Sequence, residues 1–296
     1  MKIVVSGASG LIGSALVPAL ERDGHEVLRL VRRDPASDVE VRWDPATGEI
    51  DSEHLAGVDA FVNLSGENLG KRWTAARKRE ILDSRVHSTE LVARIAAAAA
   101  DPKPAVVVAS AVGFYGDRGD EVLTEESAGG SGFLTDVVRQ WEAAADPARA
   151  AGVRVVHLRQ GIVIAKEGGA LKPMLLPFRL GAGGRLGSGK QWWSWIGMRD
   201  LVAAYMDALT TDVAGVVNAT APNPVTNEQF TKALGKALGR PTVVPVPGFA
   251  ARALFGEMGE TMLLGGQRVL PARLLDKGFE FSAPTLDTAL EQTLGS

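Results

Sequence analysis

The stretch Ile3-Val4-Val5-Ser6-Gly7-Ala8-Ser9-Gly10-Leu11-Ile12-Gly13 decides the fold of this chain. Its apolar start predicts a short buried strand, and its three glycines predict a tight turn that leads directly into a helix. Glycine lets the backbone approach a phosphate closely, and the N–H groups that open a helix attract anions. We therefore expect either a tight turn without a ligand or, as the favoured interpretation, a pyrophosphate-binding turn of the form Gly-x-x-Gly-x-x-Gly. Its expected ligand contacts are Gly7, Ser9, Gly10, Leu11, Ile12 and Gly13.

The composition limits the classes of function that the chain can have. It has 296 residues, a net charge of −3 and no cysteine, which excludes disulfides and thiol catalysis. Its four histidines are scattered, so we predict no metal site. The charge gives no support for nucleic-acid or membrane partners, and we expect a small-molecule substrate. Because no signal peptide or long apolar run is visible, the sequence predicts a cytoplasmic protein, and it sets no oligomeric state.

The order of the expected elements predicts an α/β protein. Beyond the first strand, runs rich in Val, Ile and Leu predict buried strands, and helical stripes of apolar residues lie between several of them. The expected strands are 25–31, 39–43, 58–64, 105–110, 153–158 and 213–219, and the clearest helices are 74–100 and 227–238. We expect a Rossmann doubly wound parallel sheet with a smaller C-terminal substrate lobe. Residues 1–165 would form the cofactor-binding domain, to which 196–220 return, and 166–195 and 221–296 would form the smaller lobe.

The end of the second expected strand predicts which dinucleotide binds. NAD-binding proteins of this type place an acidic residue there, about twenty residues past the glycines, to bind the ribose 2′-hydroxyl. This chain has Arg32 and Arg33 instead. A guanidinium can bind a 2′-phosphate through two charge-assisted hydrogen bonds. The sequence therefore favours NADP over NAD, unless both arginines are merely solvated.

The loop that follows strand 58–64 is expected at the same edge of the sheet. Ligands of open parallel sheets bind outside the carboxyl ends of the strands, so Leu64 and Ser65 are predicted cofactor neighbours. Glu67 and Asn68 either face the substrate or are solvated loop residues.

Several motifs along the whole chain resemble one known superfamily. They are the glycine motif, Val62-Asn-Leu-Ser-Gly66, Ser110-Ala-Val-Gly-Phe-Tyr-Gly116, Gly66-Glu-Asn68, Arg72-Trp-Thr74, Ile81-Leu-Asp-Ser-Arg85, Phe178-Arg-Leu-Gly181 and Leu186-Gly-Ser-Gly189. The chain resembles the extended short-chain dehydrogenase/reductases, and more narrowly their atypical branch of epimerase family proteins with a C-terminal domain of unknown function. The resemblance implies a Rossmann fold that binds NADP. It also implies cofactor contacts at Glu80, Arg85 and Ile162, although Glu80 and Arg85 would otherwise form helix-surface ion pairs.

The chain departs from the superfamily at the expected catalytic pair. Extended members carry Tyr-x-x-x-Lys on the helix after the fifth strand, and the equivalent place here holds Phe133 and Val137. Ser110 is the candidate that hydrogen-bonds the reacting oxygen, and Tyr115 is the tyrosine near it. Tyr115, Asp117 or Glu67 could accept the proton if burial tuned its pKa.

Two functions remain open from the sequence. The first is an NADP-dependent oxidoreductase or epimerase acting on a small carbonyl or a sugar-nucleotide-like substrate. The second is a non-catalytic NADP-binding sensor or assembly protein, which the missing pair favours. The glycine-rich stretch 168–189 predicts loops that rearrange around a ligand. The tryptophans at 192, 193 and 195 either stack on a ligand ring or pack the two lobes together.

Overall fold

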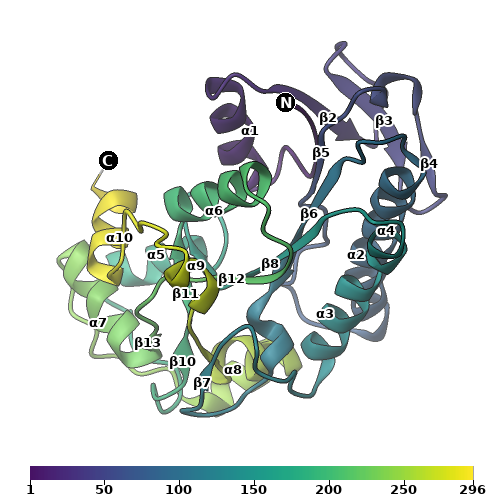
Figure 1. Ribbon diagram of the computed structural model, residues 1–296. Coiled ribbons are helices and arrows are strands. Elements are labelled where there is room, and N and C mark those ends of the chain that lie inside the picture. The colour runs from purple at the N-terminus through teal and green to yellow at the C-terminus, as the bar shows by residue number, and fades with distance from the viewer. Residues whose placement is uncertain (296) are drawn as a thin grey trace.

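The computed structural model describes residues 1–295, and within them eight strands form one sheet (Figure 1). The strand order is β12-β8-β6-β5-β1-β2-β3-β4. The strands are β1 (Lys2–Ser6), β2 (Glu26–Val31), β3 (Glu40–Asp44), β4 (Glu49–Ile50), β5 (Ala60–Asn63), β6 (Ala105–Ala111), β8 (Val155–Gln160) and β12 (Gly215–Ala219). All pair in parallel except β3 with β4. The predicted doubly wound Rossmann sheet is confirmed, and its order reverses at β1, between β2 and β5.

Helices cover both faces of this sheet because its central strands are apolar on both sides. Alternate residues of β1 serve the two layers: Ile3 and Val5 belong to one apolar cluster, and Val4 belongs to the other. The first cluster includes the helices α1 (Gly13–Arg22) and α6 (Met198–Thr210). The second includes α2 (Ala75–Ala98), α3 (Phe133–Ala143) and α4 (Asp146–Ala150), which lie on the right of Figure 1. The binding edge of the sheet is thus held between two packed layers.

Side-chain caps fix the starts of two long helices at the places that the sequence indicates. The Thr74 hydroxyl accepts a hydrogen bond from the Arg77 N–H at 3.2 Å and begins α2. Thr226 and Gln229 form a capping box that begins α7 (Asn227–Leu238), and Gly239 ends it with a φ of 62°. These contacts satisfy N–H groups that a helix end otherwise leaves without partners.

The remaining elements surround the end of the sheet where β6 and β8 terminate. Short strand pairs join β9 (Ile162–Ile164) to β11 (Trp195–Gly197), β10 (Trp192–Trp193) to β13 (Val225–Thr226), and β7 (Val122–Leu123) to β14 (Arg268–Val269). The other helical segments are α5 (Leu171–Arg179), α8 (Gly248–Phe255), a π-helical turn (Gly259–Leu264), α9 (Ala272–Asp276), α10 (Leu286–Leu294) and the 3₁₀ turns Glu53–Leu55 and Val112–Tyr115. No helix within residues 1–295 is both long and apolar enough to cross a membrane.

The stretch 168–189 contains a helix, α5, between two glycine-bearing segments, and the rearrangement of its loops around a ligand stays a prediction. The glycines lie outside the helix, whereas its Leu171, Leu175 and Phe178 are buried in an apolar cluster with α7 and α10. Burial of this helical stripe outweighs the effect of the flanking glycines.

Candidate functional site

The turn between β1 and α1 is so tight that two of its glycines leave no room for a side chain. A Cβ on Gly13 would lie 2.4 Å from the Gly7 carbonyl oxygen, and one on Gly7 would lie 2.9 Å from the carbonyl carbon of Leu64. Gly7 also has a φ of 69°, which disfavours other residues. No side chain caps the start of α1, and Ser9 and Gly10 are exposed. The turn therefore presents open backbone to a phosphate-bearing ligand.

A buried amide holds the loop after β5 against this turn. Asn63 is fully buried, and its Oδ1 accepts hydrogen bonds from the Ser6 hydroxyl at 2.6 Å and the Ser65 N–H at 3.1 Å. Its Nδ2 donates to Thr89 of α2 at 2.9 Å. The Leu64 N–H donates to the Ser6 carbonyl at 3.2 Å. These hydrogen bonds hold the loop of Leu64 and Ser65 beside Gly7.

The second half of the chain also reaches the turn. A Cβ on Gly168 would lie 3.0 Å from Cδ1 of Leu11, and one on Gly169 would lie 3.3 Å from its Cδ2. Ile162 is half-buried at the start of β9, and its N–H donates to the Ser194 carbonyl at 2.8 Å. Gly168 and Gly169 therefore form a second wall beside Leu11.

The two arginines after β2 have different surroundings. The parallel register pairs Leu30 with Ser6, so the end of β2 lies beside the glycine turn. Arg33 makes a bidentate ion pair with Glu40, with N–O distances of 2.6 and 2.8 Å. Arg32 is exposed, and it has no hydrogen bond or ion pair within residues 1–295. Arg32 is therefore the guanidinium that is free to meet an anion.

Arg85 is a buried cation directly under the loop after β5. It is 8% exposed, and its guanidinium lies 5.1 Å from the ring of Trp141 and donates to the Ile81 carbonyl at 3.0 Å. A Cβ on Gly66 would lie 3.1 Å from its Cζ. Burial lowers the pKa of Arg85 to about 10, and the described residues place no carboxylate within ion-pair distance of it. Glu80, by contrast, is exposed and pairs with Arg77 at 3.1 Å.

Ser110 is held in a buried ion-pair network. It is 3% exposed, and its hydroxyl donates to Oε1 of Glu142 at 2.6 Å. The same carboxylate accepts two hydrogen bonds from Arg159, at 2.8 and 2.7 Å. Burial would raise the pKa of Glu142, but the ion pair with Arg159 outweighs it and keeps this pKa below its usual range. The Ser110 side chain is thus occupied by protein partners, and its catalytic role stays a prediction.

Tyr115 belongs to the same network. Its side chain is fully buried, its hydroxyl donates to Oδ1 of Asn218 at 2.7 Å, and it accepts from Arg159 at 3.1 Å. Burial raises the pKa of Tyr115, which makes the phenolate harder to form. These contacts serve packing and polar satisfaction, and a role in proton transfer stays a prediction.

The two acidic candidates lie in the loops around this edge. Glu67 accepts hydrogen bonds from Arg77 at 2.7 Å and from the Asn68 N–H at 3.0 Å, and the bond from Arg77 lowers its pKa. A carboxylate with a lowered pKa is a weak general base. Asp117 is exposed, and its Oδ1 accepts from the Gly119 N–H at 3.2 Å.

Phe133 and Val137 are packing residues. Val137 is buried in an apolar cluster that also holds Trp73 of the loop before α2 and Met258 of the C-terminal segment. The Phe133 ring meets Trp73 edge-on, with 5.0 Å between centroids, and the ammonium of Lys78 lies 4.8 Å from it. This part of α3 therefore joins α2 to the C-terminal segment.

The tryptophan cluster divides into packing residues and one half-buried residue. Trp193 and Trp195 are 4% and 0% exposed, and Trp193 packs edge-on against Phe230. Trp192 is half-buried, donates to Oδ1 of Asp120 at 2.6 Å, and has the guanidinium of Arg268 over its ring at 4.4 Å.

A cavity of about 390 Å³ lies on the C-terminal side of the molecule. Polar and aromatic groups line it together with glycines, and it is bounded by Gly187, Ser188, Gln191, Gly248, Phe249, Arg252 and Leu264. Phe249 is 73% exposed although it is a large aromatic residue. None of these seven residues belongs to the glycine turn, so this cavity and the turn are separate features.

The buried polar residues that support the site do not follow from the sequence patterns above. Asn63 lies within the Val62–Gly66 motif, but the motif alone gives its side chain no role. Glu142 and Arg159 form a buried ion pair, and its signal in the sequence is an arginine directly after the expected strand 153–158.

Two family models match this chain. The model of the NAD-dependent epimerase/dehydratase family matches residues 3–220, and a domain of unknown function (DUF1731) matches residues 246–293. The epimerase family protein Mb2239 of Mycobacterium bovis is 45% identical over 291 residues, which cover 97% of this chain and 96% of that one. The epimerase family protein SDR39U1 of Homo sapiens is 40% identical over 299 residues, which cover 99% of each chain.

Solved structures give the same result. The crystal structure of human epimerase family protein SDR39U1 (isoform 2) with NADPH superposes with a TM-score of 0.90, at 38% identity over 100% of both chains. A nucleoside-diphosphate sugar epimerase from Corynebacterium glutamicum superposes with a TM-score of 0.82, at 36% identity over 100% of this chain and 58% of that one.

Proposed function

Because the chain belongs to the NAD-dependent epimerase/dehydratase family, we propose that it binds NADP at the turn between β1 and α1 and acts as an oxidoreductase or epimerase. The observation that carries the cofactor assignment is the human relative with NADPH, which matches the whole chain at 38% identity. The unpaired Arg32 beside the turn supports it, because a 2′-phosphate needs a cation at that place. NAD is the less favoured cofactor.

The residues present fit such a cofactor. The glycine cradle from Gly7 to Gly13 would hold the pyrophosphate, since a Cβ at Gly13 would fill the space that the backbone needs. Arg32 would bind the 2′-phosphate, with Arg33 as its neighbour. Buried Arg85 has no carboxylate within ion-pair distance in the described chain, so an anionic ligand would compensate its charge. The other proposed contacts are Ser9, Gly10, Leu11, Ile12, Leu64, Ser65, Glu80 and Ile162.

When bound, the nicotinamide would supply the hydride chemistry that oxidoreductases and epimerases of this kind use. The protein's own part is to orient and shield the reacting centre. Leu11 and Ile162, both half-buried, would offer apolar surface to the bound cofactor. We propose that the cavity beside Phe249 and Arg252 receives the substrate, a small carbonyl compound or a sugar-nucleotide-like molecule.

A second candidate is a non-catalytic NADP-binding sensor or assembly protein. One observation favours it: Phe133 and Val137 occupy the place of Tyr-x-x-x-Lys and pack into an apolar cluster. Tyr115 and Ser110 are also buried and hydrogen-bonded to protein groups, which supports this second candidate, whereas the enzymatic candidate requires them to face the substrate.

One experiment distinguishes these two candidates. NADPH binding is followed by fluorescence. Turnover of a panel of sugar nucleotides and small carbonyl compounds is followed both as NADPH oxidation and, with NADP added, as formation of the epimer, because an epimerase returns the hydride and consumes no cofactor. The enzymatic proposal expects at least one panel member to be reduced or epimerised, with the rate falling by about tenfold or more in Ser110→Ala while the Kd for NADPH stays unchanged. Tight NADPH binding with no turnover above background across the panel would contradict the enzyme and support the sensor.

A further inference from the structure

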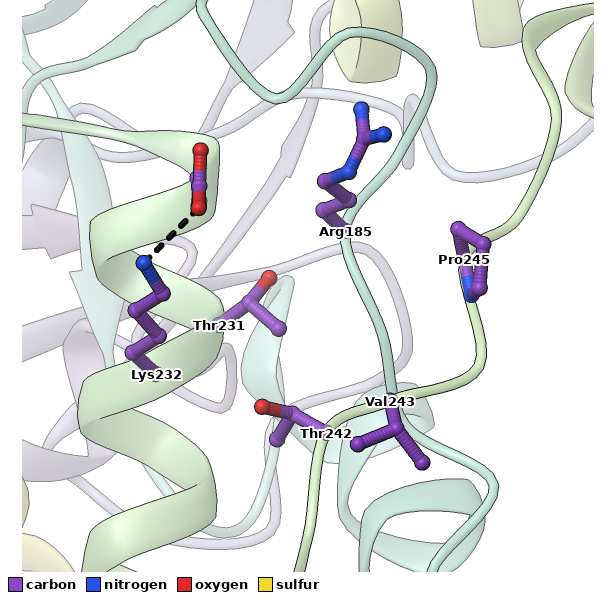
Figure 2. A pocket seen from close by; sticks show the side chains of 7 residues that line it. Arg185, Thr231, Lys232, Thr242, Val243 and Pro245 are labelled. Carbon is purple, nitrogen blue, oxygen red and sulfur yellow. Dashed lines mark ion pairs between the residues drawn. The ribbon is translucent and has the colours of Figure 1, made fainter.

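A second cavity, of about 200 Å³, lies beside α7 (Figure 2). It is lined by Arg185, Glu228, Thr231, Lys232, Thr242, Val243 and Pro245. A parallel backbone bridge joins Leu186 to Val246. Arg185 and Pro245, which precede the bridge on its two segments, line this cavity. Gly187 and Gly248, which follow the bridge, line the cavity of about 390 Å³ described above. The two cavities are therefore separate sites on one pair of chain segments.

Thr231 places an unsatisfied hydroxyl at this cavity. The residue is 2% exposed, its Oγ1 is buried, and the hydroxyl has no hydrogen-bond partner within residues 1–295. Figure 2 shows this oxygen turned toward the space between α7 and the segments of Arg185 and Pro245. Buried polar groups in folded proteins are nearly always paired, because leaving one unpaired is costly. A group from outside the chain, either a ligand or a bound water, would satisfy this hydroxyl.

A second buried donor lies one turn earlier on the same helix. Asn227 is fully buried, and its Oδ1 accepts from the Leu186 N–H at 2.8 Å, while its Nδ2 has no partner among the described residues. The backbone amides of Asn227 and Glu228 already donate, to Gln191 and Gly189, each at 2.9 Å. Side chains, and not the helix N-terminus, would therefore hold a ligand here.

The charges around the cavity favour an anion. Lys232 and Glu228 neutralise each other through an ion pair at 2.7 Å. Arg185 adds a positive charge: it donates to the Gly187 carbonyl at 2.7 Å and has no carboxylate within ion-pair distance in residues 1–295. The hydroxyls of Thr231 and Thr242 and the guanidinium of Arg185 are all donors, which is the set that a tetrahedral oxyanion requires.

We propose that this cavity binds a phosphate group, either free or carried on a small molecule, through Arg185, Lys232, Thr231 and Thr242. Its volume is below the roughly 300–1,000 Å³ of sites for larger organic ligands, which fits a small anion and not a dinucleotide. The site is independent of the NADP site proposed above.

Calorimetric titration of the full chain with inorganic phosphate, at constant ionic strength, tests this. The proposal expects saturable binding that weakens by about 5- to 10-fold in Thr231→Val, which keeps the side-chain shape, and more in Arg185→Gln. Glu228→Gln should tighten it, because it removes the one carboxylate that repels the anion. Arg199→Gln is the matched control and should change nothing, because this exposed arginine of α6 lines neither cavity.

Two further arms identify the source of the phosphate group and separate the two proposals. Glycerol 3-phosphate binding more tightly than inorganic phosphate, with glycerol inert, assigns a small-molecule ligand, and the reverse order assigns the free ion. The Thr231 effect should persist in Gly13→Ala, whose cofactor turn is disrupted. No saturable heat, or equal phosphate affinity in Thr231→Val, would overturn the proposal and leave a bound water as the partner of Thr231.

Discussion

At the scale of single residues, Arg85 shows how function and stability oppose each other in this molecule. Its guanidinium is 8% exposed and stacks on Trp141, yet the described chain supplies it with no carboxylate within ion-pair distance. A buried charge without a counter-charge destabilises the folded state, and burial accordingly lowers the pKa of Arg85 to about 10. We propose that an anionic ligand supplies the counter-charge that Arg85 lacks.

Arg85→Met should therefore separate the two effects. Methionine is shorter than arginine and loses the guanidinium contact with Trp141, but it also removes the uncompensated buried charge, so we expect the stability of the ligand-free protein to change by no more than about 1 kcal/mol. NADPH affinity should fall by about tenfold, because the charge-assisted contact is lost. Thermal unfolding and fluorescence titration measure the two quantities. A large loss of stability with unchanged NADPH affinity would show that Arg85 is structural.

At the scale of elements, the β1–turn–α1 unit is the place where we propose that the cofactor binds. The turn has no room for a side chain at residue 13, because the backbone of Gly13 lies against that of Gly7 and Ala8. The buried Asn63 then ties the turn to β5 and α2. A change in one glycine should consequently disturb the site without removing any ligand-contacting side chain.

Gly13→Ala tests that dependence. Its Cβ would lie 2.4 Å from the Gly7 carbonyl oxygen, so the turn must shift, and we expect NADPH affinity to fall by at least about tenfold while the circular dichroism of the fold is retained. Gly197→Ala is the control, because a Cβ there meets no atom closer than 3.7 Å and φ is not positive. Equal losses in both variants would mean that general destabilisation, and not the turn, is responsible.

At the scale of the whole molecule, a buried polar cluster links the sheet to the helices α3 and α4. His157 of β8 is fully buried, and its Nε2 accepts a hydrogen bond from Arg149, so the proton lies on Nδ1, which has no partner within residues 1–295. Burial lowers the pKa of His157 to about 4. The neighbouring Glu142 is ionised through Arg159.

Stability should fall as the pH is lowered from about 6.5 to about 4. Between these pH values His157 is protonated in the unfolded chain but not in the folded chain. The free energy of unfolding therefore falls by about 3 kcal/mol. Ionised Glu142 stabilises the folded state at pH values above the usual carboxyl pKa. This stabilisation is lost at still lower pH, as the pH approaches the lowered pKa of Glu142 in the folded protein. Urea unfolding across this range should show the slope in the parent and in His87→Gln, an exposed-histidine control. A slope unchanged in His157→Gln would refute the assignment.

The sequence was sufficient for the fold because its strands and glycine turn are local patterns. The strand–turn–helix at residue 3, the helices predicted at 74–100 and 227–238 and the apolar strand 105–110 all appear in the structure close to the predicted places. The pairing of Arg33 with Glu40, the network around Ser110 and the orphaned Thr231 hydroxyl depend on tertiary contacts. Residue type and spacing along the chain do not encode them.

The most direct test of the central claim is the ratio of NADP to NAD affinity in the parent protein and in two variants. We predict that the parent binds NADP at least about tenfold more tightly than NAD, because one charge-assisted contact to a phosphate has that magnitude. Arg32→Ala should remove most of this preference, and Arg33→Ala should remove less, since Arg33 is already paired with Glu40. Equal affinities for NADP and NAD in the parent would contradict the account.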